Sequence, residues 1–405
     1  MRILSIHNRY AWRGGEDENY EAESRLLGKH DHEVHQLIAD NSEITRKGRL
    51  AVLLAMWSAT WNDDRYEEVR SSVSRNRPDI AYIHNFWFAL SPSVVAAAHD
   101  SGIPVLINLP NFRLLCVGGT LLDRVGRLCE DCVGHSPLRG VLRRCYHKSF
   151  LASFAVARMI SYNRGRGTWF RDVDLFTTPS KSCRDILVRG GLPEDRIAVV
   201  PNFVDEPATS GSLERKKPLT AGHVVYIGRL SPEKGLRTLL KAWERVEKAT
   251  TAELRIVGDG PLRGELERLA TGRRVVFTGP VKSEQVYDEI STAQVLVLPS
   301  ECYETFGRVV IEAYACGRPV VVSDIGGPGE IVRNGETGLV FEHGNAEDLA
   351  EKLVNLLNDE VSCQRMGQAA RSVYLEHYTP DAVYPVLMNC FQQAIENHKN
   401  CKQPV

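Results

Sequence analysis

Short apolar segments alternate with stretches of helical pattern along nearly the whole chain. Each segment is rich in Val, Ile and Leu and flanked by turn-forming residues, which predicts a β-strand. The predicted strands are RILSIHN, HEVHQLIAD, DIAYIHNF, IPVLINLP, LFTTPS and IAVVPNF, followed by HVVYIGRL, AELRIVGDG, RVVFTGPV, QVLVLPS, RPVVVSD and TGLVFE. Strands that alternate with helices are typical of parallel sheets covered on both faces. The pattern therefore predicts an α/β fold with two doubly wound parallel sheets.

A polar segment separates the two series of strands. Residues 205–222, DEPATSGSLERKKPLTAG, are rich in Pro, Gly, Ser and charge and therefore predict a linker. The expected organisation is a first domain over 1–204, a second over 223–378 and a helical tail over 379–405. Two such domains leave a cleft between the carboxyl ends of their strands, where sheets of this kind bind ligands.

The composition narrows the class of protein. A chain of 405 residues favours two domains, and its net charge of −1 argues against a nucleic-acid binder. The opening MRILSIHN resembles a strand more than a signal peptide, and no apolar run approaches the roughly 20 residues of a membrane span. Ten cysteines without an export signal favour a reducing compartment. We therefore expect a cytoplasmic protein, with attachment to the inner face of a membrane left open.

The stretch YETFGRVVIE (303–312) carries the first candidate chemistry. Gly307 falls where a helix is expected to begin, and the free N–H groups of a helix N-terminus bind phosphate. Glu312, one turn into that helix, would accept two hydrogen bonds from a vicinal diol such as a ribose. Glu304, before the helix, would face the group attached beyond the phosphates. This spacing suits a sugar nucleotide, although glutamates on helices are commonly only solvated.

The loop GRLSPEKG (228–235) supplies positive charge to the same domain. Gly228 permits a tight turn after the strand. The Arg229 guanidinium can donate two parallel hydrogen bonds to a phosphate, and the Lys234 ammonium adds a positive charge. Together the two cations would neutralise a diphosphate without a metal ion. Alone the loop reads as a solvated basic turn, but its combination with YETFGRVVIE favours a nucleotide.

Six segments of the second half resemble, in order and spacing, the nucleotide-binding domain of retaining glycosyltransferases of family four. They are GRLSPEKG, RIVGDGPL, VVFTGPV, VLPSECYETFGRVVIEAYACGRPVV, DIGGPGEIV and TGLVF. The first half resembles a subgroup of that family through IHNRYAWRGGEDE, IHNFWFALSPSV, LPNFRLLC and CEDC. The resemblance implies a GT-B fold, in which two Rossmann-like domains face a central cleft and the tail crosses back onto the first domain. It also implies a nucleotide-sugar donor, by family frequency a UDP-sugar, and a hydroxyl acceptor in polysaccharide, glycolipid or natural-product biosynthesis.

The resemblance assigns roles to single residues. Glu312 would hold the ribose, Glu304 would contact the donor sugar or the neighbouring phosphate, and Glu16 would lie near the reacting centre. The Gly14–Gly15 turn would bring backbone N–H groups to the phosphates. The implied donor-binding residues are Gly14, Gly15, Glu16, Gly228, Arg229, Lys234, Val281, Glu304, Thr305, Phe306, Gly307 and Glu312.

Transfer with retention can proceed by front-face attack, in which the departing phosphate oxygen takes the acceptor proton. Such an enzyme needs positioning and charge stabilisation more than a nucleophile. The expected catalytic residues are Arg229, Lys234, Glu304, His84 and Asn111. We expect no catalytic metal, because the one formal DxD, residues 172–174, stands at the start of a strand, where it caps the preceding helix or is solvated.

One position departs from the subgroup. Its members usually carry a histidine two residues before the Phe-Arg of the NFR segment, whereas this chain has Pro110. His84, at the end of the preceding strand, remains. The exchange leaves open an unusual donor sugar, slower chemistry or an impaired transferase.

Four cysteines lie in a polar, glycine-rich insertion over 113–148. Cys116, Cys129, Cys132 and Cys145 have the spacing C-x12-C-x2-C-x12-C, which suits four thiolates around a structural zinc ion. An iron–sulfur cluster uses the same ligands. Packing of the thiols as small apolar groups, or disulfide pairing, are the alternatives.

Two segments combine cations with apolar side chains. Between Arg139 and Arg171 the chain has eight Lys or Arg and no Asp or Glu, interleaved with Phe150, Phe154, Trp169 and Phe170. Residues 45–61, TRKGRLAVLLAMWSATW, place cations before an apolar stretch. Both segments suit a peripheral contact with an anionic membrane surface, and thus a lipid-linked acceptor, or else ordinary amphipathic helices.

Two other functions fit the same architecture. A sugar-nucleotide epimerase would need acid and base groups around the sugar, which the missing histidine disfavours. A non-catalytic donor-binding scaffold would have no need of Arg229, Lys234, Glu304 and Glu312 together.

Overall fold

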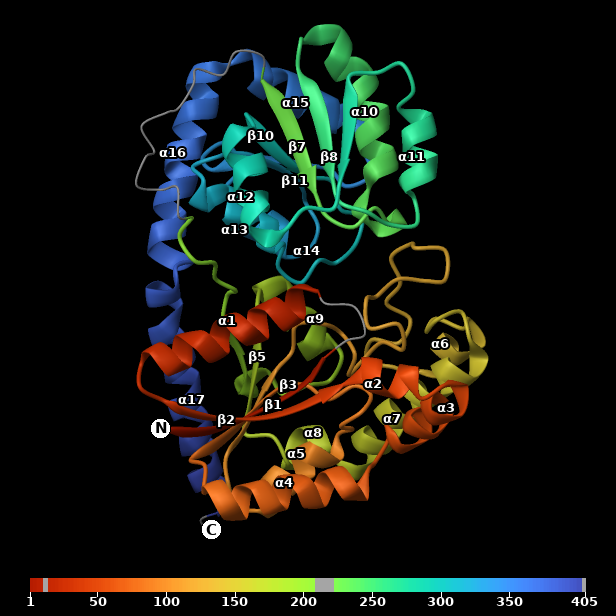
Figure 1. The fold of residues 1–405 in the computed structure, drawn as a ribbon, viewed down its shortest axis with the longest axis vertical. Helices are drawn as coiled ribbons and strands as arrows, with labels where there is room; N and C mark the ends of the chain where they lie inside the picture. The colour runs from red at the N-terminus through yellow and green to blue at the C-terminus, as the bar shows by residue number, and fades with distance from the viewer. Residues whose placement is uncertain (10–13, 208–221, 403–405) are drawn as a thin grey trace. The chain divides into compact units, whose positions relative to one another are not determined.

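The computed structural model describes residues 1–9, 14–207 and 222–402, which form two compact units (Figure 1). Unit 1 comprises Met1–Val125, Cys129–Pro201 and the chain from Val383 on. Unit 2 comprises Gly126–Leu128 and Asn202–Ala382. Most of the expected linker, residues 208–221, lies outside the described residues.

Unit 1 is built on a six-stranded parallel sheet of order β2-β1-β3-β4-β5-β6. Its strands are β1 (Arg2–Arg9), β2 (Glu33–Asp40), β3 (Ile80–Asn85), β4 (Val105–Asn108), β5 (Leu175–Thr178) and β6 (Ile197–Val199). Its helices are α1 (Gly15–Lys29), α2 (Asn41–Arg46), α3 (Arg49–Ser58), α4 (Asp63–Asn76), α5 (Ser93–Asp100), α6 (Leu138–Leu142), α7 (Phe150–Arg166), α8 (Thr168–Arg171) and α9 (Lys181–Arg189).

Unit 2 has a second six-stranded parallel sheet, of order β12-β11-β10-β7-β8-β9. Its strands are β7 (His223–Ile227), β8 (Glu253–Val257), β9 (Val275–Gly279), β10 (Val295–Leu298), β11 (Val320–Ser323) and β12 (Gly338–Phe341). Its helices are α10 (Leu236–Ala249), α11 (Arg263–Leu269), α12 (Ser283–Thr292), α13 (Arg308–Ala315), α14 (Gly326–Ile331), α15 (Ala346–Asn358) and α16 (Glu360–His377).

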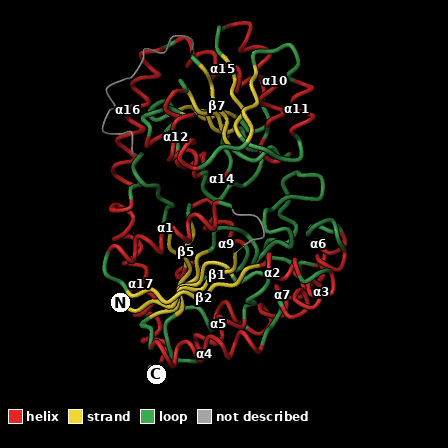
Figure 2. The backbone as a smooth tube through the Cα atoms, viewed as in Figure 1, coloured by secondary structure: helices red, strands yellow, loops and turns green. Residues whose placement is uncertain are grey.

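The twelve expected strands are confirmed. In both units helices lie on either side of the strands (Figure 2). All four residues of β10 and of β11 are buried. Strands covered on both faces read as continuous apolar runs without alternation, which is why short Val- and Leu-rich segments were informative here.

The final helix, α17 (Pro380–Lys402), passes into unit 1. The Phe391 ring packs edge-on against Tyr82 of β3, with ring centroids 5.1 Å apart. Near the end of the helix, His398 Nδ1 lies 3.1 Å from Asp174 Oδ2. These apolar and polar contacts hold the tail on the first sheet.

Of the two expectations for the DxD pair, solvation is wrong, whereas the cap of the preceding helix is confirmed for Asp172, the C-cap of α8. Asp172 and Asp174 are both buried. Asp172 ends α8 and lies 2.7 Å from the guanidinium of Arg166, and Asp174 accepts a hydrogen bond of 2.7 Å from the backbone N–H of Val105. Both carboxylates thus fasten unit 1 internally, because a buried charge needs partners.

Candidate active site

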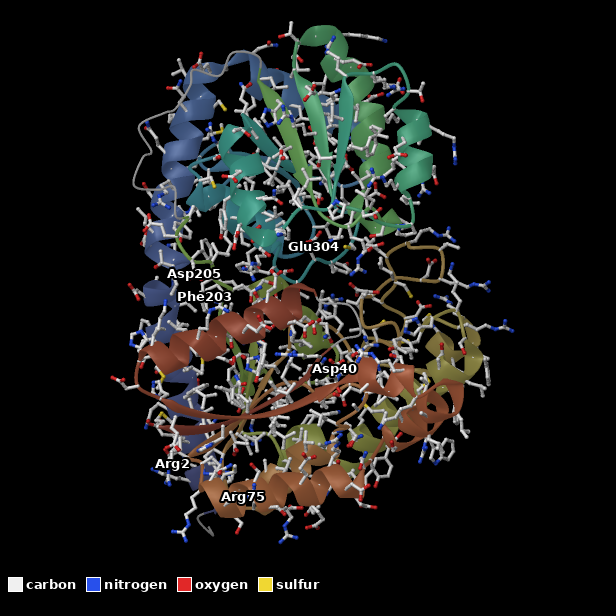
Figure 3. The ribbon with its side chains drawn as sticks, viewed as in Figure 1. Arg2, Asp40, Arg75, Phe203, Asp205 and Glu304 are labelled. Atoms are coloured by element: carbon white, nitrogen blue, oxygen red, sulfur yellow. The ribbon has the colours of Figure 1, made fainter. Side chains whose placement is uncertain are left out.

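The strand order of unit 2 determines where its two nucleotide motifs lie. Strands β7 and β10 are neighbours, and the chain winds outward from them in opposite directions. In doubly wound sheets, ligands bind outside the carboxyl ends of the strands at such a switch point. GRLSPEKG follows β7 and PSECYETFG follows β10, so the two motifs come from neighbouring strands. Glu304 lies in this loop region beyond the strand ends (Figure 3).

Direct contacts join the two loops. Lys234 Nζ lies 2.7 Å from Glu304 Oε1, and the N–H of Glu301 donates to the carbonyl of Glu233 at 2.8 Å. Gly235 has a φ of +66°, and a Cβ at this position would lie 1.7 Å from the carbonyl oxygen of Pro299. Only glycine allows the first loop to approach the second so closely.

The ion pair keeps both of its members charged. Burial alone would raise the pKa of Glu304, but the nearby Lys234 ammonium and a hydrogen bond from Ser300 lower it overall. Burial likewise tends to lower the pKa of Lys234, and the Glu304 carboxylate reverses the shift and raises it. The two side chains keep 24% and 12% of their surface exposed, so the pair can still meet a ligand.

The helix start expected at Gly307 is confirmed. Gly307 is the N-cap of α13 with a φ of +83°, and a Cβ there would meet Pro328 Cγ at 2.6 Å. The N–H of Gly327, in α14, donates to the carbonyl of Glu304 at 2.7 Å. The glycines of DIGGPGE thus let a second helix start pack against the loop that carries Glu304.

Glu312 has a partner that the sequence analysis missed. Its Oε1 accepts a hydrogen bond of 3.1 Å from Arg308 Nε, one turn earlier on α13. The signal was available, because residues four apart face each other on a helix. The contact with Arg308 therefore orients the Glu312 carboxylate.

The remaining residues expected to bind the donor in unit 2 differ in how far they are exposed. Arg229 is exposed, and its guanidinium makes no ion pair with the described part of the chain. Its carbonyl accepts a 2.9 Å hydrogen bond from the Tyr226 hydroxyl, beside Gly228. Phe306 is buried in the hydrophobic core, and Val281, half-buried, packs against it. Thr305 is half-buried between Glu304 and Phe306.

Unit 1 has its own switch point, between β1 and β3. His7, near the end of β1, places Nε2 at 2.8 Å from Asp17 Oδ1 in the first turn of α1. The other oxygen of Asp17 accepts a 3.3 Å hydrogen bond from the N–H of Gly14, the N-cap of α1 that precedes Gly15. The glycine turn is thereby tied to the strand. Sequence analysis missed this pair although both residues stand in IHNRYAWRGGEDE, because the segment does not show which of its side chains meet.

Two expected residues of unit 1 meet. Asn111 Nδ2 donates to Glu16 Oε1 at 3.0 Å, and Asn111 Oδ1 accepts from the N–H of Arg113 at 2.9 Å. The Arg113 guanidinium lies over the Tyr146 ring, 5.0 Å from its centroid. Pro110, half-buried, precedes Asn111 directly. The NFR segment is thus fixed to the start of α1 on one side and to the cysteine insertion on the other.

His84 belongs to a buried cluster with a second titratable group. Its Nδ1 lies 3.9 Å from Glu23 Oε2, which also accepts a 2.6 Å hydrogen bond from the Tyr82 hydroxyl. Burial, and then the nearby His7, lower the pKa of His84 well below its ordinary value. Burial raises the pKa of Glu23 to about 7. His84 is therefore neutral at physiological pH, and Glu23, which sequence analysis missed, titrates there.

The four cysteines of the insertion influence one another electrostatically and form no disulfide. Burial, then the neighbouring Cys116, Cys132 and Cys129, raise the pKa of Cys145 to about 11. Arg143 donates to Cys129 Sγ at 3.3 Å. Within the described ranges, no three His, Cys, Asp or Glu side chains are arranged to hold a metal ion. The metal therefore stays a prediction.

Comparison with known proteins agrees with these motifs. Residues 221–359 match the family model of glycosyl transferases group 1. Sulfoquinovosyl transferase SQD2 of Arabidopsis thaliana is 33% identical over 213 residues, which are 50% of this chain and 41% of that protein. The chain spans about half the length of the curated relatives it matches.

Two solved structures resemble nearly the whole chain. Anabaena HepE in complex with UDP has a TM-score of 0.64 at 18% identity, over 97% of this chain and 100% of HepE. Sucrose-phosphate synthase of Thermosynechococcus elongatus has a TM-score of 0.66 at 17% identity, over 98% and 99%. The chain has the GT-B fold of glycosyltransferases.

Proposed function

We propose that this chain is a retaining, metal-independent glycosyltransferase of family four. It transfers a hexosyl group from a nucleoside-diphosphate sugar, with UDP the expected carrier, to a hydroxyl acceptor. The observation that carries the proposal is the meeting of Lys234 and Glu304 at the switch point of unit 2, beside the N-terminus of α13. A helix N-terminus and an ammonium suit a diphosphate, and a carboxylate beyond them suits sugar hydroxyls. The group 1 match and the UDP-bound neighbour support the same class of donor.

The ion pair suggests how the donor is received. Before the donor binds, Glu304 satisfies Lys234, which prevents a half-buried ammonium from lacking a partner. The ammonium has three donors, so a β-phosphate oxygen can be added without breaking the pair. Exposed Arg229 supplies the second cation. Glu312, oriented by Arg308, takes the two ribose hydroxyls.

The proposed chemistry requires charge stabilisation at the leaving group. The bond between the anomeric carbon and the phosphate oxygen breaks, and the acceptor oxygen bonds to the same face of that carbon. The acceptor proton passes to the departing phosphate oxygen. Lys234 and Arg229 stabilise the charge that develops on the diphosphate, which is the work a metal ion does in other transferases.

Unit 1 is proposed to supply the acceptor side. Glu16, held by Asn111, is assigned to the reacting centre, and the Gly14–Gly15 turn to the donor phosphates. His84, being neutral, can accept or donate a hydrogen bond but contributes no positive charge. Pro110 offers no polar group, so Asn111 and His84 take the place of the usual histidine.

The test is a thermal-shift and mass-spectrometric screen of the full chain against sugar nucleotides, without added metal. One donor should raise the melting temperature and hydrolyse slowly to free sugar and nucleoside diphosphate. Lys234→Met should lose both effects, whereas Lys241→Met, on the outer surface of α10, should lose neither. Retention is read from the anomeric signal of the product by NMR. Stabilisation without turnover, even with acceptors, would indicate a scaffold, and no stabilisation by any donor would refute the proposal.

A further inference from the structure

Exposed apolar side chains gather on three helices of unit 1. Nine of the eighteen large apolar side chains exposed in the described residues belong to α3, α6 and α7. Eight of them, which we call the α3/α6/α7 surface, are Leu50, Leu54, Trp57, Leu138, Leu142, Phe150, Leu151 and Phe154. Such concentration on one part of a protein usually marks a surface that binds something.

The apolar side chains follow the exposed faces of their helices. On α3, Leu50, Leu54 and Trp57 recur at spacings of four and three, which places them on one side. On α7, Phe150 and Phe154 recur at a spacing of four, while Ala152, Val156 and other residues of the opposite side are buried. An amphipathic helix with a merely solvated outer face would carry polar residues there.

A contact joins α3 to α7. The Arg158 guanidinium of α7 lies over the Trp57 ring, 4.0 Å from its centroid, and donates to the Trp57 carbonyl at 3.3 Å. Helix α6 packs on α7 as well, and the three helices are neighbours in Figure 1. The helices that carry the exposed apolar groups are therefore neighbours in unit 1.

Positive charge surrounds these apolar groups. The segment from Arg139 to Arg171 has eight cations and no carboxylate, and residues 45–61 also lack carboxylates. Four of these cations pair with carboxylates outside the segment, Arg139 and Arg143 with Asp131, and Arg166 and Arg171 with Asp172. Arg144 and Lys148 are exposed and have no ion pair with a residue in the described ranges. Trp169, expected on this surface, is buried against Phe86, so that expectation is wrong.

We propose that the α3/α6/α7 surface rests on the headgroup region of an anionic lipid bilayer. Exposed Leu, Phe and Trp side chains on the outer faces of helices, bordered by Lys and Arg, are the combination that binds such an interface. The proposed contact is peripheral, and no helix in the described residues is long and apolar enough to cross the membrane. A second copy of the chain fits poorly, because a symmetric contact would set cations against cations. The proposal does not depend on the transferase activity.

The test is co-sedimentation of the full chain with vesicles of phosphatidylcholine, with or without phosphatidylglycerol. We expect binding to the anionic vesicles only, and release at high salt because such charges are screened. Arg144→Gln with Lys148→Gln should weaken binding about fivefold for each cation removed. Leu54→Gln with Leu151→Gln and Phe154→Gln should also weaken binding, since apolar contact is lost.

Matched controls separate this surface from general effects. Leu269→Gln with Val361→Gln and Leu375→Gln changes exposed apolar residues of unit 2 and should leave vesicle binding unchanged. The melting temperature of each variant checks folding. The proposal is overturned if anionic vesicles bind no better than neutral ones, or if the controls lose as much binding as the surface variants. A dimer in solution that the apolar substitutions abolish would also overturn it, in favour of a second copy.

Discussion

The substitution Glu23→Gln tests the buried cluster beneath the switch point of unit 1. Glu23 is 7% exposed, hydrogen-bonded by Tyr82 and close to neutral His84. Glutamine keeps the shape of the protonated acid and an oxygen that can accept from Tyr82, but it cannot ionise. The variant therefore removes one titratable group and leaves the packing around the side chain nearly unchanged.

The expected effect on the free energy of unfolding follows from the pKa of Glu23, which burial raises from 4.5 to about 7. Between these values the folded protein retains a proton that the unfolded chain has released. Glu23 therefore stabilises the fold most fully below the unfolded pKa, and this stability is lost as pH rises through about 7. The shift corresponds to roughly 3 kcal/mol of unfolding free energy.

The assay is urea unfolding of both proteins from about pH 4.5 to about pH 8. Tryptophan fluorescence reports mainly on unit 1, which contains five of the six tryptophans. Relative to the variant, the wild type should lose roughly 3 kcal/mol across this range. Glu21→Gln on the same helix, where the carboxylate is partly exposed, is the control and should not alter the pH dependence. The reasoning would be refuted if the difference in unfolding free energy between wild type and Glu23→Gln did not change with pH. It would also be refuted if the wild type gained stability over the variant at high pH.

Three further outcomes are expected. Glu312→Ala should weaken nucleotide binding in calorimetry by at least about tenfold, because one charged acceptor would serve both ribose hydroxyls; unchanged affinity would remove that role. Gly307→Ala should destabilise unit 2 by at least roughly 1–2 kcal/mol in thermal unfolding, since its φ is +83° and a Cβ would meet Pro328. A stable, fully binding variant would contradict that geometry. Elemental analysis should find about one zinc ion per native chain, lost on Cys129→Ser with Cys132→Ser; native protein without metal would end the zinc prediction.

Much of the fold could be predicted from the sequence because its signals are local. Short apolar runs such as VLVL in β10, bounded by turn residues, favour a strand that is buried on both faces. Gly307 precedes a helix because a left-handed residue suits that helix start. Glu304, Lys234 and Glu312 could be named as candidates because their motifs combine residue type with fixed spacing.

Partners that come from distant segments could not be predicted from the sequence, since such contacts depend on strand order. Lys234 and Glu304 meet only because β7 and β10 are neighbours, and His7 meets Asp17 only because α1 folds back on β1. The titration of Glu23 near neutral pH arises from burial. The sequence alone thus determined the elements and the chemical groups available. The tertiary structure decided which groups are paired, buried or exposed, because free energies of charge and of apolar surface depend on surroundings that the local sequence does not contain.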